Sequence, residues 1–134
     1  MKNSQFNIGT LILRLSLGLM LLFHGYAKLI HGVDGLKGLM SNSNLPEFLA
    51  YGVYVGEVIA PLLMVIGYRT KIAALIVSAT MFVAIFTAHS EEIFSLSKHG
   101  GWAVELPALY FFGSLAVFFL GAGKIALSSS NRWD

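Results

Sequence analysis

The sequence contains no cysteine and few charged residues. Among its 134 residues, 12% are charged and 56% are hydrophobic, whereas an ordinary soluble domain has about 25% charged residues. The mean hydropathy is +0.73. The lack of cysteine excludes disulfides, thiol redox pairs, thiolate metal sites and a cysteine nucleophile. So little charge in so apolar a chain is typical of a protein that lies in the lipid bilayer.

Basic residues are also too scattered to indicate nucleic-acid binding. The net charge is +2, and the nine lysines and arginines are spread along the chain. Membrane topology explains this distribution better than a nucleic-acid partner does.

Four apolar stretches predict the architecture. They cover residues 8–30, 48–67, 72–88 and 102–122. Each is close to the ~20 residues that a helix needs to cross the bilayer, and four such segments cannot close a barrel. The chain is therefore expected to be one all-α domain, an integral-membrane antiparallel four-helix bundle. The first stretch lacks a small-residue cleavage site and is expected to be a retained span. In the first connection, Leu36, Leu39 and Met40 are expected on the membrane interface as a short amphipathic turn.

The positions of lysine and arginine predict the orientation. Five lie on the side that holds both chain ends and the turn at 68–71: Lys2, Arg69, Lys71, Lys124 and Arg132. The other side holds Lys28, Lys37 and Lys98. Because cytoplasmic loops carry the excess of positive charge, both termini are expected in the cytoplasm.

Charged residues inside spans are the main functional candidates. The first span carries Arg14, His24 and Lys28, and a charge at the bilayer centre costs about 2.5–3.5 kcal/mol. His24 and Lys28 are four residues apart and so lie on one face of the helix. The alternative is that Arg14 and Lys28 only extend their charges to the headgroups at opposite ends of the span.

Glu57, near the middle of the second span, is the most informative residue. A carboxylate there needs a cationic partner or takes up a proton. Pro61 removes the N–H that would bond the Glu57 carbonyl, so both the side-chain and the backbone oxygens of Glu57 are expected to be available. Tyr54 lies on the same face. The alternative is an ion pair of Glu57 with Arg14 or Lys28 that only holds helices together.

His89 and Glu105 lie at the outer boundary of the third and fourth spans. We expect both to join His24, Lys28 and Glu57 in the outer half of the bundle, with Arg14 below them. The formal charges of four of these residues cancel, which favours a paired network of Arg14, Lys28, Glu57 and Glu105. The alternative for Glu105 is that it complements the dipole of its own helix. No ligand-spacing motif supports a metal site.

A line of small residues in the second span predicts close helix packing. Gly52 and Gly56 are four residues apart and Ala60 continues the line. This pattern leaves packing inside one chain and dimerisation as open alternatives.

Three segments carry a resemblance to a known family. They are Arg14-Leu15-x-x-Gly18 with His24-Gly25-x-x-Lys28-Leu29, then Leu45-Pro46 with Gly56-Glu57 and Gly67-Tyr68-Arg69-Thr70, and finally Glu105 with Gly121-x-Gly123-Lys124. In order and spacing they resemble the DoxX family of small bacterial membrane proteins. The closing segment departs from the family pattern, because Ile125-Ala126-Leu127-Ser128 lacks its final acidic position. The resemblance implies a four-helix protein of the bacterial inner membrane.

The resemblance also implies a quinone-associated redox subunit that works with a partner oxidoreductase. The sequence itself shows no flavin, haem or nucleotide motif. In this hypothesis Glu57 is the proton acceptor and His24 or His89 the hydrogen-bond donor, so Glu57 and His24 are the catalytic candidates. The binding candidates are Lys28, Arg14, Tyr54, His89 and Glu105. Two alternatives stay open: a transporter of a small solute or proton, which needs a homo-oligomer, and a non-catalytic membrane scaffold or assembly subunit.

Overall fold

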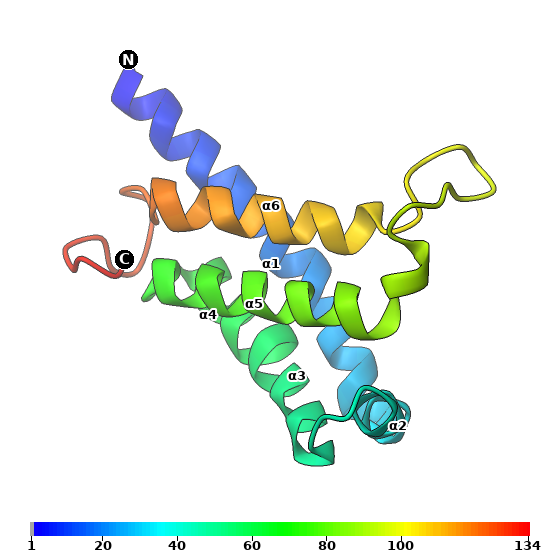
Figure 1. Cartoon of the computed structure of the whole chain (residues 1–134). Helices are drawn as coiled ribbons and strands as arrows, with labels where there is room; N and C mark the ends of the chain where they lie inside the picture. Colours follow the sequence, from blue (N-terminus) through cyan, green and yellow to red (C-terminus); the bar gives the residue numbers. More distant parts are fainter. Residues whose placement is uncertain (1) are drawn as a thin grey trace.

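The computed structural model describes residues 2–134 and contains no strand in that range. The helical elements are α1 (Lys2–His31), α2 (Asp34–Asn42), η1 (Glu47–Tyr51), α3 (Gly52–Tyr54), η2 (Val55–Ile59), α4 (Ala60–Ile66), α5 (Thr70–Ala88), η3 (Ser90–Glu92) and α6 (Glu105–Leu120). Long α1 crosses the pair α5 and α6, and α2 lies at the end of the bundle opposite the two chain termini (Figure 1). The predicted all-α membrane bundle is confirmed.

Three segments are long and apolar enough to cross a bilayer. They are Asn3–His31, the run Glu47–Ile66 and Thr70–Ala88. The fourth, α6, has 16 residues and so spans about 24 Å at 1.5 Å per residue. The predicted stretch 102–122 is therefore longer than the helix. Gly121, at φ 81° and ψ −169°, ends α6 in a conformation that suits only glycine, and residues 102–104 belong to the preceding loop.

The second span is not a regular helix. It begins with the 3₁₀ turns of η1, passes through α3, and widens at η2 into π geometry, where the N–H of Ala60 donates to the carbonyl of Val55, five residues earlier. Pro61 has no N–H to donate, which favours such a wide turn just before it. The widened turn contains Glu57.

Glycines let the helices approach each other closely in the middle of the bundle. A β-carbon at Gly25 would overlap the backbone carbonyl of Glu57, and one at Gly56 would overlap the side chain of Thr80. Ala60, in the same line of small residues, is fully buried. Gly56 and Ala60 therefore serve packing within the chain, whereas Gly52 has no neighbour within 4 Å of such a carbon.

The short helix α2 lies where the sequence predicted a short amphipathic turn, and its apolar residues pack against the protein. Its Met40 and the preceding Val33 are buried against Ala50 of η1, and Leu36 and Leu39 are partly buried in the same cluster. This small apolar cluster holds α2 against the start of the second span.

The segment after α6 folds back on the bundle and closes the termini end. The guanidinium of Arg14, which is 1% exposed, donates to the carbonyls of Met64 (2.9 Å) and Ile125. Asp134 accepts a hydrogen bond from the Arg69 guanidinium at 3.1 Å. The pKa of the Asp134 carboxyl is lowered, mainly by the hydrogen bond that it accepts from the Ser128 hydroxyl. Burial opposes this effect, and Arg69 lowers the pKa further. Asp134 is therefore the carboxylate that binds Ser128 and Arg69, whereas the segment Ile125-Ala126-Leu127-Ser128 contains no acidic residue of its own.

We expect Gly25→Ala to destabilise the bundle, because the new methyl group meets a backbone carbonyl that cannot rotate away. The cost expected for such overpacking is about 1–3 kcal/mol, and thermal unfolding in mild detergent measures it. Gly9→Ala in the same helix is the matched control, since nothing lies within 4 Å of its β-carbon. Its melting temperature should stay equal or rise. Equal stability of both variants would contradict the close contact at Gly25.

Candidate functional site

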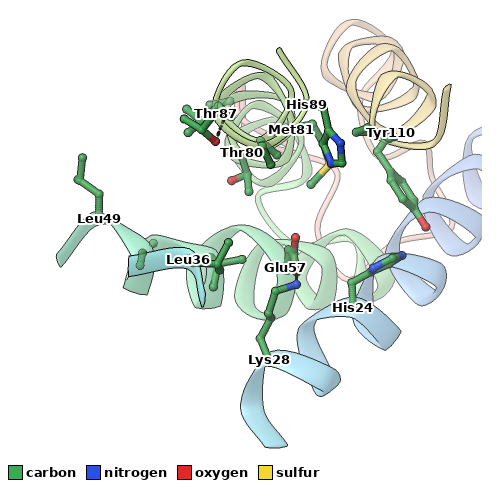
Figure 2. A pocket seen from close by; sticks show the side chains of 18 of the residues that line it. His24, Lys28, Leu36, Leu49, Glu57, Thr80, Met81, Thr87, His89 and Tyr110 are labelled. Atoms are coloured by element: carbon green, nitrogen blue, oxygen red, sulfur yellow. Dashed lines mark hydrogen bonds and ion pairs between the residues drawn. The ribbon is translucent and has the colours of Figure 1, made fainter. Parts of the chain in front are cut away.

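A cavity of about 760 Å³ lies at the end of the bundle away from the chain termini. It is enclosed by the second half of α1, by α2, by the segment from residue 45 to Glu57, and by the last turns of α5 and the first turns of α6. The small residues Gly52, Ala79 and Ala84 line it, and their lack of bulk leaves space where the helices diverge. Leucine side chains from α2 and η1 cover one side (Figure 2).

Lys28 and Glu57 form the charged centre of this cavity. Lys28 Nζ lies 3.4 Å from Glu57 Oε2, and the two side chains are 29% and 11% exposed. Figure 2 shows them pointing toward one another from α1 and η2. Of the two ion pairs that the sequence left open for Glu57, the structure therefore forms the one with Lys28. The wide turn of η2 and the position of Lys28 one turn after His24 together direct these groups into the cavity.

His24 and Tyr110 form a second polar pair beside the first. Their ring centroids are 5.9 Å apart, and the rings meet edge to face at 83°. Both residues line the cavity, and Tyr110 is 6% exposed. Our sequence interpretation named Tyr54 as a candidate and missed Tyr110. The sequence feature that could have identified Tyr110 is a phenol in an otherwise apolar span, because a buried hydroxyl there needs a polar neighbour.

His89 lies where α5 ends, and it also lines the cavity. Its Nδ1 is 3.2 Å from Glu92 Oε2 in the loop. The cavity's two threonines direct their hydroxyls elsewhere: Thr80 donates to Ile76 (2.8 Å) and Thr87 to Val83 (2.7 Å) within their own helix. The polar side chains of the cavity that can bind a ligand are thus those of Lys28, Glu57, His24, Tyr110 and His89.

Three other candidate residues lie outside the cavity lining. Tyr54 does not line the cavity, and its hydroxyl donates a hydrogen bond to the backbone carbonyl of Lys28 at 3.3 Å. Arg14 lies toward the termini end, about 21 Å from Lys28 along the helix axis at 1.5 Å per residue. Glu105 is exposed at the start of α6, and its carboxylate lies against Gly101. The predicted four-charge network of Arg14, Lys28, Glu57 and Glu105 is therefore wrong.

The sequence also predicted that the side-chain carboxylate and the backbone carbonyl of Glu57 are both free to bind a ligand, and this is wrong for the carbonyl. The backbone carbonyl of Glu57 is covered by α1, where Gly25 allows the helix to come so close. Only the carboxylate faces the cavity. The reason is geometric: the wide turn presents the carbonyl to one neighbour and the side chain to another, and the sequence does not reveal which.

The cavity combines an apolar lining with groups that can donate and accept protons. An ammonium, an imidazole and a phenol can donate hydrogen bonds to a ligand, and the carboxylate can accept a proton. Within residues 2–134, no three His, Asp or Glu side chains gather as metal ligands would.

The comparisons with known proteins identify the family of this chain. The DoxX family model matches residues 9–90. The chain belongs to the DoxX family. The matched region holds His24, Lys28, Glu57 and His89, whereas Tyr110 lies beyond it.

Two relatives align along most of their length. A Bacillus subtilis (strain 168) protein named "Putative oxidoreductase CatD" is 34% identical over 108 residues, which cover 81% of this chain and 80% of the relative. A Haemophilus influenzae protein without an assigned function is 32% identical over 120 residues, 87% of this chain and 86% of the relative. No solved structure matches this chain.

We expect Lys28→Met to destabilise the protein more than Lys28→Met combined with Glu57→Gln does. The single change leaves the nearly buried carboxylate without its cation, a loss expected to be about 1–3 kcal/mol. The double change removes the unpaired charge as well and recovers part of that loss. Thermal unfolding of the wild type, both single variants and the double variant completes the cycle. Strictly additive effects would contradict a direct coupling between Lys28 and Glu57.

Proposed function

We propose that this DoxX-family membrane protein binds a quinone in the cavity at Lys28 and Glu57 and acts as the quinone-associated subunit of a partner oxidoreductase. The observation that carries the proposal is the apolar cavity lined by two polar pairs, Lys28–Glu57 and His24–Tyr110, whose α1 members His24 and Lys28 are one helical turn apart. The name of the Bacillus subtilis relative includes the word oxidoreductase, which favours redox chemistry over transport.

The residues that line the cavity fit a quinone. A quinone has two carbonyl oxygens that accept hydrogen bonds, a flat ring and an apolar tail. The volume of about 760 Å³ is in the range of small-molecule sites, roughly 300–1,000 Å³. Leu21, Leu49 and Leu106 offer apolar surface to the ring and tail, while Lys28 and His24 supply donors for the carbonyls.

The roles of the side chains follow from their charges and contacts. The Lys28 ammonium holds one carbonyl oxygen and stabilises negative charge that develops there. His24, oriented by its edge-to-face contact with Tyr110, would donate to the same head group. Glu57 carries a proton between Lys28 and that oxygen, because its carboxylate lies 3.4 Å from the ammonium. Tyr54 positions Lys28 through the hydrogen bond to its carbonyl.

A quinone held by these residues would supply two-electron, two-proton redox chemistry. In this proposal the protons pass through Glu57 and His24, and the electrons come from a redox centre of the partner. The sequence supports a partner because it has no cysteine and no flavin or haem motif.

We expect the protein purified in mild detergent to contain near-stoichiometric quinone, detected in a solvent extract by chromatography with ultraviolet and mass detection. Glu57→Gln and His24→Ala should each lower the quinone content at least about tenfold, the effect of losing roughly 1.4 kcal/mol of binding energy. Glu91→Gln and His99→Ala, both on exposed loop positions, are the matched controls and should retain it.

An extract without quinone from a folded preparation, together with no binding when ubiquinone or menaquinone is added back, would refute this function. Loss of complex recovery without any loss of quinone would instead indicate a scaffold. Proton or solute flux through proteoliposomes that stops in Glu57→Gln would indicate the transport alternative.

We also propose that the protein lies in the bacterial inner membrane with both termini in the cytoplasm. The excess of lysine and arginine on the termini side supports this orientation. The lack of native cysteine makes a direct test simple, because any introduced thiol is unique. In intact cells, a membrane-impermeant maleimide should label Ser97→Cys, at an exposed position between α5 and α6, and should label Ser4→Cys in α1 only after permeabilisation. The reverse labelling pattern would overturn the orientation.

A further inference from the structure

A second cavity lies at the termini end of the bundle, about 420 Å³ in volume. It is formed where the first turns of α1, the start of α5 and the segment after α6 meet. Five polar residues line it: Asn3, Asn7, Lys71, Lys124 and Ser129. The quinone proposal uses none of these groups, and the two cavities share no lining residue.

The lining of this second cavity is basic and contains no acidic residue. Neither Lys71 nor Lys124 forms an ion pair with any residue in the described range 2–134. The side-chain carboxylate of the nearby Asp134 is bound by the side chains of Arg69 and Ser128 and by the Asn131 N–H, and it pairs with Arg69 and with neither lysine. Two lysine side chains without an ion-pair partner among residues 2–134 thus line one polar recess.

Backbone contacts fix the shape of this recess. The side chain of Lys71 packs over Gly121, where an added β-carbon would lie 3.3 Å from its Cε. The N–H of Lys124 donates to Asn7 Oδ1 at 3.0 Å, which leaves the amide NH₂ of Asn7 as a donor. Gly123, at φ 74°, brings the turn against Thr10, where a side chain would collide with the threonine hydroxyl.

The recess also has an apolar edge. Phe6 and Leu120 belong to its lining, and each is 44% exposed. They lie on α1 and α6, both of which are apolar helices of the membrane bundle. A ligand suited to the site therefore combines an anionic oxyanion with an apolar portion that continues along these helices.

We propose that this cavity binds the phosphodiester headgroup of an anionic phospholipid. Lys71 and Lys124 bind the phosphate oxygens, the Asn7 amide and the Ser129 hydroxyl donate further hydrogen bonds, and Phe6 and Leu120 contact the start of the acyl chains. Basic pockets between helices near the membrane surface bind anionic headgroups through this combination of charge and apolar contact.

Native mass spectrometry of the full chain in detergent, with added dioleoyl phosphatidylglycerol, tests the proposal. The wild type should bind this lipid more tightly than dioleoyl phosphatidylcholine. Lys71→Gln with Lys124→Gln should weaken binding roughly 25-fold, at about fivefold for each lysine near a membrane surface. Lys37→Gln with Lys98→Gln removes two charges at the other end of the molecule and should leave the affinity unchanged.

Two further measurements keep the result unambiguous. Lys124→Gln alone changes an exposed side chain, so it should fold normally and bind phosphatidylglycerol about fivefold more weakly. Inorganic phosphate in large excess should not displace the lipid. Displacement by phosphate would assign the site to a free anion and overturn the lipid proposal, as would equal binding of phosphatidylcholine or equal loss in the control double variant.

Discussion

The widened turn of the second span at Val55–Ile59 is the feature on which the cavity depends. Pro61 removes one backbone donor, and the helix accommodates the loss by a π turn. That turn gives Glu57 two different neighbours: its carbonyl meets Gly25, and its carboxylate meets Lys28. Both neighbours lie on α1, three residues apart, so a single helix serves as packing partner and as counter-charge.

The bundle is divided into a close-packed half and an open half. Ala60, Ala73 and Ala74 are fully buried in the main core, where small side chains let helices approach and dispersion contacts replace a hydrophobic driving force in lipid. Beyond Gly25 and Gly56 the helices diverge, and α2 closes the gap from the side. Rigidity on one side of Glu57 and space on the other are what a binding site needs, because the charged groups are held while the ligand space stays open.

Much of the fold could be predicted from the sequence, because long apolar runs and the spacing of His24 and Lys28 are direct physical signals. The cost of unpaired charge in a membrane predicted a cationic partner for Glu57 but left Arg14 and Lys28 as alternatives; the structure forms the pair with Lys28. What the sequence could not reveal was the identity of neutral partners. Arg14 donates to two backbone carbonyls. Every residue has such a carbonyl, so the sequence does not show which ones bind Arg14, and we grouped Arg14 with the carboxylates. Glu105 begins α6 as expected, but its carboxylate lies against Gly101 of the loop and outside the cavity, because the sequence does not show how that loop folds beside the start of the helix.

Tyr110 shows a further limit of reasoning from charge. Its hydroxyl is neutral, and its span is one of the most apolar in the chain, so only its contact with His24 draws it into the site. Pairwise contacts between α1 and α6 depend on the crossing of two distant helices, and no local pattern encodes that crossing.

The burial of Arg14 constrains how the chain is made. Its two carbonyl acceptors lie 50 and 111 residues further along the chain, and at a synthesis rate of about 5–20 residues per second the second one emerges on the order of 5–20 s later. During that interval the nascent first helix carries a guanidinium without its native acceptors, which opposes its settling into hydrocarbon. The segment after α6 therefore completes the burial of the Arg14 guanidinium, and the termini end of the bundle cannot close before that segment has been synthesised.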